Sequence, residues 1–293
     1  MRFAAAFAPV LLTACASSTP AIELKTAPVE AETTPATDWG GLLEAEAAAL
    51  VAEIPDAEVR LVVFDPNSDA MLATHGPVND ASPTGSSIKP LTVYAALVAG
   101  LDPALSIDAS NPVAIGEMTI EDHRNNGVLT LETAIARSSN IAIAHVLDAV
   151  PWTDVYPWVA SSVGLPEAAG LSRSEAVAQL GGFTTTAPLA RMVRAYASME
   201  SAADAGGRVL QMLVAAVGPD GTGHGACVEG LSVLGKTGTA RSERGTEAVF
   251  IGRASNGERT LWIGVSVGTR EAEVYGGTVA ASAFARISEA GLS

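Results

Sequence analysis

The chain has 293 residues, 48% hydrophobic and 17% charged, which is enough for one large domain or two small ones. Its formal net charge of −15 argues against a nucleic acid as partner, because a surface that binds nucleic acid must offset phosphate charge. The four histidines are scattered and neither of the two cysteines lies near a histidine pair. We therefore expect no metal site and no cofactor.

The N-terminus has the features of a bacterial lipoprotein signal peptide. Arg2 precedes an apolar run, residues 3–12, that is too short to span a bilayer. The sequence Leu12-Thr13-Ala14-Cys15 then resembles a lipobox, in which the cysteine is lipidated and becomes the first mature residue. We predict a signal peptide over 1–14 and a lipid on Cys15. The alternative is an ordinary cleaved signal peptide with an incidental cysteine.

The segment that follows Cys15 is rich in Ala, Thr, Ser and Pro and lacks helical or strand periodicity. This composition is typical of a disordered tether, which we predict over residues 15–38, followed by one folded domain over 39–293. As a flexible coil, the tether would reach about 25–30 Å, so an anchored domain could act some distance from the membrane.

The folded domain is predicted to have strands at both ends and helices between them. An Ala-rich helix is expected over 42–53, and strands over 59–64 and 70–74 flank a strong turn signal. The region 86–217 is mostly helical in pattern. Further strands are expected over 232–240, 247–253 and 259–268, then a closing helix over 278–290. The pattern predicts an α+β fold: an antiparallel sheet of about five strands flanked by helices, with an inserted, mostly helical lobe.

The stretch Gly85-Ser86-Ser87-Ile88-Lys89-Pro90 carries the first chemical signal. Ser86 and Lys89 are three residues apart, so a helix that begins here would place both side chains on one face. A serine hydroxyl becomes a good nucleophile only when a neighbouring base takes its proton. Lysine can be that base where burial makes its neutral amine accessible.

Two further motifs follow in order. The chain has only three lysines. The last of them, Lys236, opens Lys236-Thr237-Gly238-Thr239. Between it and Lys89 lies Ser138-Ser139-Asn140. Each motif alone has a structural explanation, because Ser and Asn are favoured helix caps and a lysine protects an exposed edge strand. The ordered triple, with matching helix and strand context, is far more specific.

The set Ser-x-x-Lys, Ser-x-Asn and Lys-Thr-Gly resembles the transpeptidase domain of penicillin-binding proteins and serine β-lactamases. The resemblance covers about residues 58–291 and includes Gly127-Val128-Leu129-Thr130-Leu131, Gly221-Thr222-Gly223 and Tyr275-Gly276-Gly277. The region between Asn140 and Lys236 is short for this family. The resemblance implies a DD-peptidase/β-lactamase-like fold.

The resemblance implies catalytic roles for four residues. Ser86 would be the acylated nucleophile and Lys89 the base that activates it. Ser138 would relay a proton toward the leaving amine, held in place by Lys89 and Lys236. Lys236 would add positive potential.

The same resemblance implies substrate-binding residues. Asn140 would hold the peptide carbonyl of the substrate through its amide N–H, and the hydroxyls of Thr237 and Thr239 would bind the terminal carboxylate. The backbone N–H groups of Ser86 and Thr239 would form the oxyanion hole. Gly238 would let the substrate approach the strand closely. Nearby charged residues, Asp122, Arg124 and Arg241, are as readily explained as solvated surface, and we assign them no role.

These roles imply a penicillin-sensitive serine acyltransferase that acts on the D-Ala-D-Ala ends of peptidoglycan stem peptides, as a DD-transpeptidase or DD-carboxypeptidase. It would lie in the cell envelope on the periplasmic side, in the outer membrane of a Gram-negative host because Ala16 follows Cys15. Expected partners are stem peptides, β-lactams, and a separate glycan polymerase or divisome or elongasome proteins; the sequence does not give the oligomeric state.

Two other functions stay open at this point: a class D-like serine β-lactamase, and a non-catalytic lipoprotein that binds β-lactam or peptidoglycan. A class A β-lactamase needs an added glutamate from a Glu-x-x-x-Asn-like loop. Glu167 and Glu175 follow the second motif, but no asparagine lies within five residues after either. Class D enzymes need a carboxylated lysine in an apolar pocket. The polar Asn140 disfavours such a pocket, whereas Ile88 and Val93 favour it.

Overall fold

The computed structural model describes residues 37–242 and 245–293. The predicted signal peptide, Cys15 and nearly all of the predicted tether lie outside these residues. The α-helices are α1 (Trp39–Glu53), α2 (Lys89–Val98), α3 (Leu131–Ala136), α4 (Asn140–Ala149), α5 (Trp152–Val163), α6 (Arg173–Leu180), α7 (Leu189–Met199), α8 (Ala203–Val217) and α9 (Ala281–Leu292). Shorter helical turns cover η1 (Gly85–Ile88), η2 (His224–Ala226) and η3 (Gly276–Ala280). Within the described ranges, no helix is long and apolar enough to cross a membrane.

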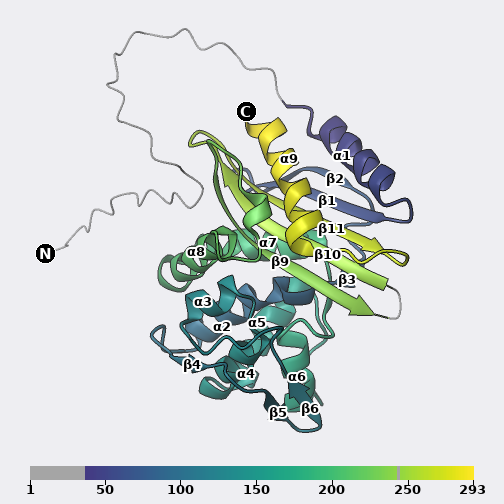
Figure 1. Cartoon of the computed structure of the whole chain (residues 1–293). Helices are drawn as coiled ribbons and strands as arrows, with labels where there is room; N and C mark the ends of the chain where they lie inside the picture. The colour runs from purple at the N-terminus through teal and green to yellow at the C-terminus, as the bar shows by residue number, and fades with distance from the viewer. Residues whose placement is uncertain (1–36, 243–244) are drawn as a thin grey trace, which may run out of the picture.

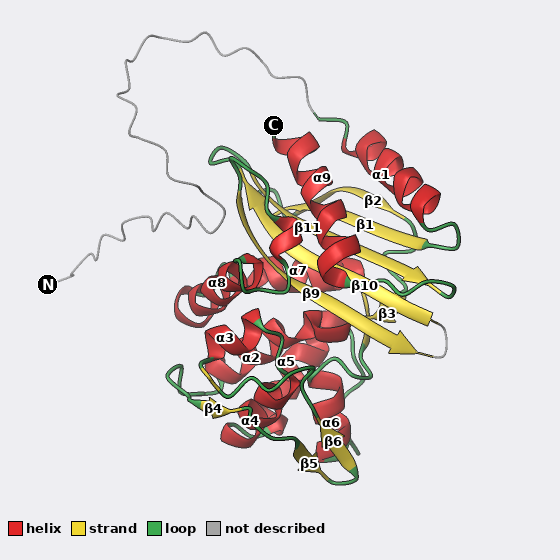
Figure 2. Ribbon diagram, viewed as in Figure 1, coloured by secondary structure: helices red, strands yellow, loops and turns green. Residues whose placement is uncertain are grey.

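The central sheet joins strands from the two ends of the domain (Figure 2). Its five antiparallel strands run in the order β2-β1-β11-β10-β9. Their bounds are β1 (Glu58–Asp65), β2 (Ala70–His75), β9 (Ser232–Ser242), β10 (Gly245–Ser255) and β11 (Thr260–Thr269). Three further strand pairs are small: β3 (Ala81–Pro83) with β8 (Thr186–Pro188), β4 (Ile107–Asp108) with β7 (Val128–Leu129), and β5 (Val113–Ile115) with β6 (Met118–Ile120). The predicted α+β fold with one five-stranded sheet is confirmed.

Both faces of the sheet are covered, which is why residues 61–64 of β1 form a continuous apolar run instead of alternating. Helices α1 and α9 lie on one face (Figure 1), where Leu43, Leu50, Phe250 and Phe284 belong to one apolar core. The other face meets α7 and the helical lobe in a second core. Strand β9 is an edge strand, so one side of its backbone is left free beside the lobe.

Several element bounds differ from the prediction for physical reasons. Helix α1 begins at Trp39, three residues earlier than predicted, because the Asp38 carboxylate accepts a hydrogen bond from the Gly41 N–H and caps the helix. Helix α8 lies inside the region predicted to be mostly helical but was not predicted as a separate helix, since Gly206-Gly207 weakens its helical pattern. Gly206 is needed there because a Cβ atom would lie 1.9 Å from the Met199 carbonyl oxygen.

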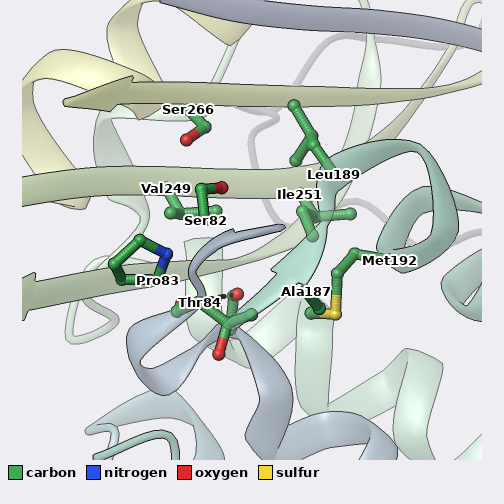
Figure 3. A pocket seen from close by; sticks show the side chains of 10 residues that line it. Ser82, Pro83, Thr84, Ala187, Leu189, Met192, Val249, Ile251 and Ser266 are labelled. Atoms are coloured by element: carbon green, nitrogen blue, oxygen red, sulfur yellow. Dashed lines mark hydrogen bonds between the residues drawn. The ribbon is translucent and has the colours of Figure 1, made fainter. Parts of the chain in front are cut away.

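The segment that leads to Ser86 is packed tightly against the sheet. Figure 3 shows Ser82, Pro83 and Thr84 of this segment facing side chains of β10, β11 and α7. The space left between them is only about 10 Å³, at the lower limit of what one water molecule needs. The Tyr196 hydroxyl of α7 also donates a hydrogen bond to the Ser87 carbonyl at 2.5 Å. The nucleophile segment is therefore held from behind by the sheet and α7.

Candidate active site

Ser86 and Lys89 lie on a tight helical turn. The predicted α-helix starting at Ser86 is instead a 3₁₀ turn, Gly85–Ile88, which continues as α2 from Lys89. In a 3₁₀ turn the side chains at positions i and i+3 are eclipsed, so Ser86 and Lys89 share one face, as predicted. Ser86 is half-buried and Lys89 is fully buried.

Two glycines allow this turn to touch β9. Gly85 has φ of +51°, and a Cβ atom there would lie 2.7 Å from the Thr239 backbone nitrogen and oxygen. A Cβ atom on Gly238 would lie 2.2 Å from the Thr84 carbonyl oxygen. Side chains at either position would push the two segments apart. The contact brings the Ser86 turn beside the predicted oxyanion donor, Thr239.

Ser138 lies between the two buried lysines. It adopts the left-handed conformation, with φ of +59°, while Ser139 caps α4 by accepting a hydrogen bond from the Ala142 N–H. The Lys236 ammonium donates to the Ser138 hydroxyl at 2.9 Å, and Lys89 donates to the Ser138 carbonyl at 2.8 Å. Both lysines therefore hold Ser138, although Lys89 does so through the backbone. The helix-cap explanation also applies, but to Ser139.

The Asn140 side chain is bonded within the protein at both ends. Its carbonyl oxygen accepts a hydrogen bond from the Lys89 amine at 2.6 Å. Its amide nitrogen donates to the Glu121 carbonyl at 2.7 Å. The predicted role, donation to a substrate carbonyl, would have to use the second N–H of this amide. The sequence motif did not indicate that Asn140 also orients Lys89.

Burial lowers the pKa of both lysines. It lowers the pKa of Lys89 from its ordinary value of 10.5 to about 7, and the negative charge of Asp122 opposes part of this shift. Burial, and then the nearby charge of Lys89, holds the pKa of Lys236 well below its ordinary range. A large fraction of Lys89 is thus the neutral amine near pH 7, which is the form able to accept a proton.

Asp122 is a site residue that the sequence analysis left unassigned. One carboxylate oxygen accepts hydrogen bonds from the backbone N–H groups of Asn140 (2.5 Å) and Ile141 (3.2 Å). The other accepts from the Ser139 hydroxyl and the Asn126 amide, both at 2.7 Å. Asp122 therefore anchors the second motif, and its negative charge raises the pKa of Lys89. It lies in a loop without periodicity, so no sequence pattern indicated its role.

The threonines of the third motif are linked to their surroundings. Thr237 and Thr222 share a hydrogen bond between their hydroxyls at 2.6 Å, and Lys236 lies 3.4 Å from the Thr237 hydroxyl. The Thr239 hydroxyl accepts from the Gly276 N–H at 3.0 Å. Thr222 was absent from the predicted site, although it belongs to the Gly-Thr-Gly segment of the resemblance. It enlarges the row of hydroxyls along β9.

Comparison with known proteins identifies the family of the chain. The family model described as the penicillin-binding protein transpeptidase domain matches residues 49–179 and 194–289, most of the described domain. The chain belongs to the penicillin-binding protein transpeptidase family. The predicted resemblance is therefore confirmed, and the three motifs fall within the matched region of this transpeptidase-family chain.

Sequence relatives are proteins named probable peptidoglycan D,D-transpeptidase PenA. That of Neisseria gonorrhoeae is 25% identical over 273 residues, covering 76% of this chain and 47% of the relative. That of Neisseria flavescens is 25% identical over 300 residues, covering 84% and 75%. The chain thus spans about half the length of the first of these relatives.

Solved structures share the fold. The transpeptidase domain of penicillin-binding protein 3 from Burkholderia pseudomallei superposes with a TM-score of 0.76 at 22% identity, covering 90% of this chain and 96% of that one. A peptidoglycan glycosyltransferase from Burkholderia ambifaria gives a TM-score of 0.75 at 23% identity, covering 86% and 94%. The sheet with its inserted helical lobe is therefore the fold of these domains.

Proposed function

We propose that the protein is a serine acyltransferase that acts on the D-Ala-D-Ala ends of peptidoglycan stem peptides through an acyl-Ser86 intermediate. The observation that carries the proposal is the pair of fully buried lysines that meet at Ser138, with the pKa of Lys89 lowered to about 7 one turn after Ser86. Family membership and relatives named for peptidoglycan D,D-transpeptidase support it.

Acylation would begin with proton transfer from the Ser86 hydroxyl to the neutral Lys89 amine. The Ser86 oxygen attacks the carbonyl between the two D-alanines, and the backbone N–H groups of Ser86 and Thr239 would stabilise the oxyanion. The leaving amine of the terminal D-Ala needs a proton. Ser138 would deliver it, since its hydroxyl is held by the Lys236 ammonium at 2.9 Å.

The third motif would hold the substrate along the edge strand β9. The terminal carboxylate would bind the hydroxyls of Thr237 and Thr239 and the positive potential of Lys236. Gly238 lacks a side chain, so the substrate backbone can lie close to the strand. Asn140 would complete the site with its remaining N–H.

The rate at which the acyl-enzyme is hydrolysed distinguishes the acyltransferase from a β-lactamase, because both form the same acyl-serine. The Lys89 amine is bonded to the Ser138 carbonyl and the Asn140 amide oxygen, two acceptors that suit an amine and disfavour a carboxylated lysine. Glu175 is exposed, and its carboxylate accepts hydrogen bonds from Ser172 in the cap of α6. We therefore expect a long-lived penicilloyl enzyme.

The function is tested by incubating the purified full chain with a peptide that ends in D-Ala-D-Ala and measuring release of D-alanine. We expect release by the wild-type protein and none by Ser86→Ala. A chromogenic cephalosporin, with bicarbonate present, should give one equivalent of product followed by near silence. Sustained cephalosporin hydrolysis at about 1 per second or faster would instead indicate a β-lactamase. Failure of wild type to acylate with either substrate would support a non-catalytic role.

The acylation rate should depend on the protonation of Lys89. Below about pH 7 the amine is protonated and cannot accept the Ser86 proton, so the rate should rise about tenfold per pH unit and then level off. The measurement is the rate of acylation by a fluorescent penicillin between about pH 5 and 9. A rising limb in the range of ordinary carboxylates would contradict Lys89 as the base.

Asp122→Asn separates charge from hydrogen bonding. The variant keeps an oxygen for the two backbone N–H groups, and the Asn126 amide, whose buried oxygen has no partner, can turn to accept from the new NH₂. Loss of the negative charge should move the rising limb of the pH profile to lower pH, because Asp122 raises the pKa of Lys89.

Asp122→Ala is the matched variant that also removes the anchor of the second motif. It leaves buried donors of Ser139, Asn140 and Ile141 unpaired, and we expect the plateau rate to fall roughly tenfold to a hundredfold through misplacement of the site. Equal pH profiles for Asp122→Asn and wild type would contradict the electrostatic role of Asp122.

The cellular location rests on Cys15, which lies outside the described residues. We propose that Cys15 carries a lipid and that the domain acts on the periplasmic side of the envelope, with outer-membrane sorting in a Gram-negative host. Cys15→Ser should move the protein from the membrane fraction to the soluble fraction, measured by immunoblotting of cell fractions. Ser17→Ala, two residues later, is the matched control and should stay in the membrane fraction. Membrane retention of Cys15→Ser would exclude the lipobox.

A further inference from the structure

A hollow of about 1010 Å³ opens between strand β3 and the sheet, at the start of β1 and β10 and the end of β11. Ala81, Ser82 and Pro83 of β3 line it on one side. None of the residues proposed for catalysis or substrate binding lines it. Its volume is near the upper limit for small-molecule pockets. The hollow is therefore separate from the candidate active site and large enough for an organic ligand.

Two glutamates flank a glycine on the sheet side of this hollow. Gly268 of β11 pairs with Glu58 of β1 on one side and with Glu247 of β10 on the other, so both glutamates lie on one face of the sheet. A Cβ atom on Gly268 would lie 2.5 Å from Oε2 of Glu247. The Glu247 carboxylate therefore occupies the space that a side chain at position 268 would fill.

Arg60 gives the two glutamates only one positive charge. Its guanidinium contacts Glu58 at 2.8 Å and Oε1 of Glu247 at 3.2 Å, and both Arg60 and Glu247 are buried. The hydroxyl of Ser266, labelled in Figure 3, also donates to Oε1 of Glu247. In the part of the chain that the structure describes, no group donates a hydrogen bond to Oε2. One oxygen of a buried carboxylate is thus left for a ligand.

The charges around this oxygen favour a cation. Burial raises the pKa of Glu247 and the charge of Glu58 raises it further, although the contacts with Ser266 and Arg60 oppose the shift. Acids outnumber bases among the residues that line the hollow: Asp56, Glu58, Glu247 and Glu271 against Arg60 and Arg270. A buried charged acceptor without a donor is unfavourable, so a positively charged donor would stabilise it.

An organic cation fits this site better than a metal ion. Asp56 already accepts hydrogen bonds from the Thr269 hydroxyl and two backbone N–H groups, and the described residues hold no group of three or more His, Cys, Asp or Glu side chains that could bind a metal. A primary ammonium group offers three N–H donors. The Ser82 hydroxyl is a second acceptor at the hollow, because Ser82 is only 5% exposed and its hydroxyl has no hydrogen-bond partner among the described residues.

We propose that this hollow binds a small organic molecule through a primary ammonium group, which donates hydrogen bonds to Oε2 of Glu247 and to the Ser82 hydroxyl. The carbon atoms of the ligand pack against Ala81 and Pro83 of β3. This binding does not depend on acyl transfer at Ser86, so it stands or fails independently of the proposed function.

The test uses n-pentylamine as the ammonium ligand and n-pentanol as the neutral ligand of the same length. Each is titrated into the ¹⁵N-labelled full chain, and the backbone amide signals of Gly268 and Ser82 are followed by NMR. Glu247→Gln removes the charge that the ammonium group would bind. Glu167→Gln is the matched control, because it changes the net charge equally at an exposed loop residue outside the hollow.

A second pair of variants leaves the buried contact between Arg60 and Glu247 untouched, so the test does not depend on the folding of Glu247→Gln. Thr186 of β8 is exposed and lines the hollow. Thr186→Lys places a tethered ammonium group beside the site, which repels n-pentylamine or competes with it. Thr186→Gln adds a long side chain without the charge and is the control for Thr186→Lys.

We expect n-pentylamine to shift both signals in wild type, Glu167→Gln and Thr186→Gln, with a dissociation constant in roughly the millimolar range for so small a ligand. Glu247→Gln and Thr186→Lys should weaken binding at least about fivefold. Equal binding of n-pentanol would overturn the proposal, as would unchanged affinity in Thr186→Lys or in a folded Glu247→Gln. Absence of a shift at Gly268 up to about 50 mM n-pentylamine would also overturn it.

Discussion

Replacement of Lys89 by arginine is expected to lower the rate of acylation by penicillin about a thousandfold, within the range that a positioned general base contributes. The variant keeps the positive charge but loses the base, since arginine does not deprotonate in a protein. The wild-type site depends on the neutral amine, which burial makes available near pH 7. The rate is measured by following a fluorescent penicillin adduct over time.

Folding must be controlled, because Lys89 is fully buried and arginine is larger. Lys89→Met keeps the volume close to that of lysine and should be equally slow, so the two variants together separate chemistry from packing. Thermal unfolding and the circular dichroism spectrum report whether each is folded. A folded arginine variant that acylates within about tenfold of wild type, a barrier change under ~1.4 kcal/mol, would mean that another group is the base.

Replacement of Gly238 by alanine is expected to damage both stability and acylation. The added methyl group would lie 2.2 Å from the Thr84 carbonyl oxygen and 3.1 Å from the Ser87 nitrogen, and both are backbone atoms that no side-chain rotation can move away. The turn that carries Ser86 must therefore shift from β9. We expect a loss of roughly 1–3 kcal/mol in the free energy of unfolding and about a hundredfold in acylation rate.

Gly207→Ala is the matched control for this variant. Gly207 lies inside α8, and a methyl group there would meet no atom within 4 Å. Alanine is favoured over glycine in a helix interior by about 0.5–1 kcal/mol, so this variant should be slightly more stable and acylate normally. Wild-type acylation by Gly238→Ala would show that the contact between the Ser86 turn and β9 is not required.

The sheet could be predicted from sequence because its strands are bounded by clear turn signals and β9 carries one of the family motifs. The dipeptide Asn256-Gly257 is one such signal, and in the structure it lies in the turn that joins β10 to β11. Helix α8 was harder, because the pair Gly206-Gly207 mimics a break, although only Gly206 is required by the close contact with Met199. Tertiary packing there overrides local propensity.

The site was predictable as far as its motifs extend. Lys89 and Lys236 both donate hydrogen bonds to Ser138, and Ser86 lies on the helical turn before Lys89, while the catalytic roles of the four residues stay predictions. The separate roles of the residues in Ser138-Ser139-Asn140 could not be predicted. Which serine caps α4 depends on the left-handed backbone of Ser138.

Two features of the site depend on contacts that no spacing encodes. Asp122 meets the second motif only after the chain folds back from the β6–β7 connection, so its role follows from hydrogen bonds and not from sequence distance. The lowered pKa of Lys89 arises from complete burial, which depends on how the lobe packs against the sheet. The role of Asp122 and the lowered pKa of Lys89 can both be derived once the fold is known.

The central claim is that Ser86 is the residue that becomes acylated, and mass spectrometry after incubation with penicillin tests it most directly. Wild type should gain the mass of one penicillin, peptide mapping should place the adduct on Ser86, and Ser86→Ala should gain none. Ser87→Ala is the matched control, because the Ser87 hydroxyl is buried and donates to the Thr84 carbonyl at 2.7 Å, so this variant should still be labelled. An adduct on any other residue, or labelling that persists in Ser86→Ala, would contradict the account.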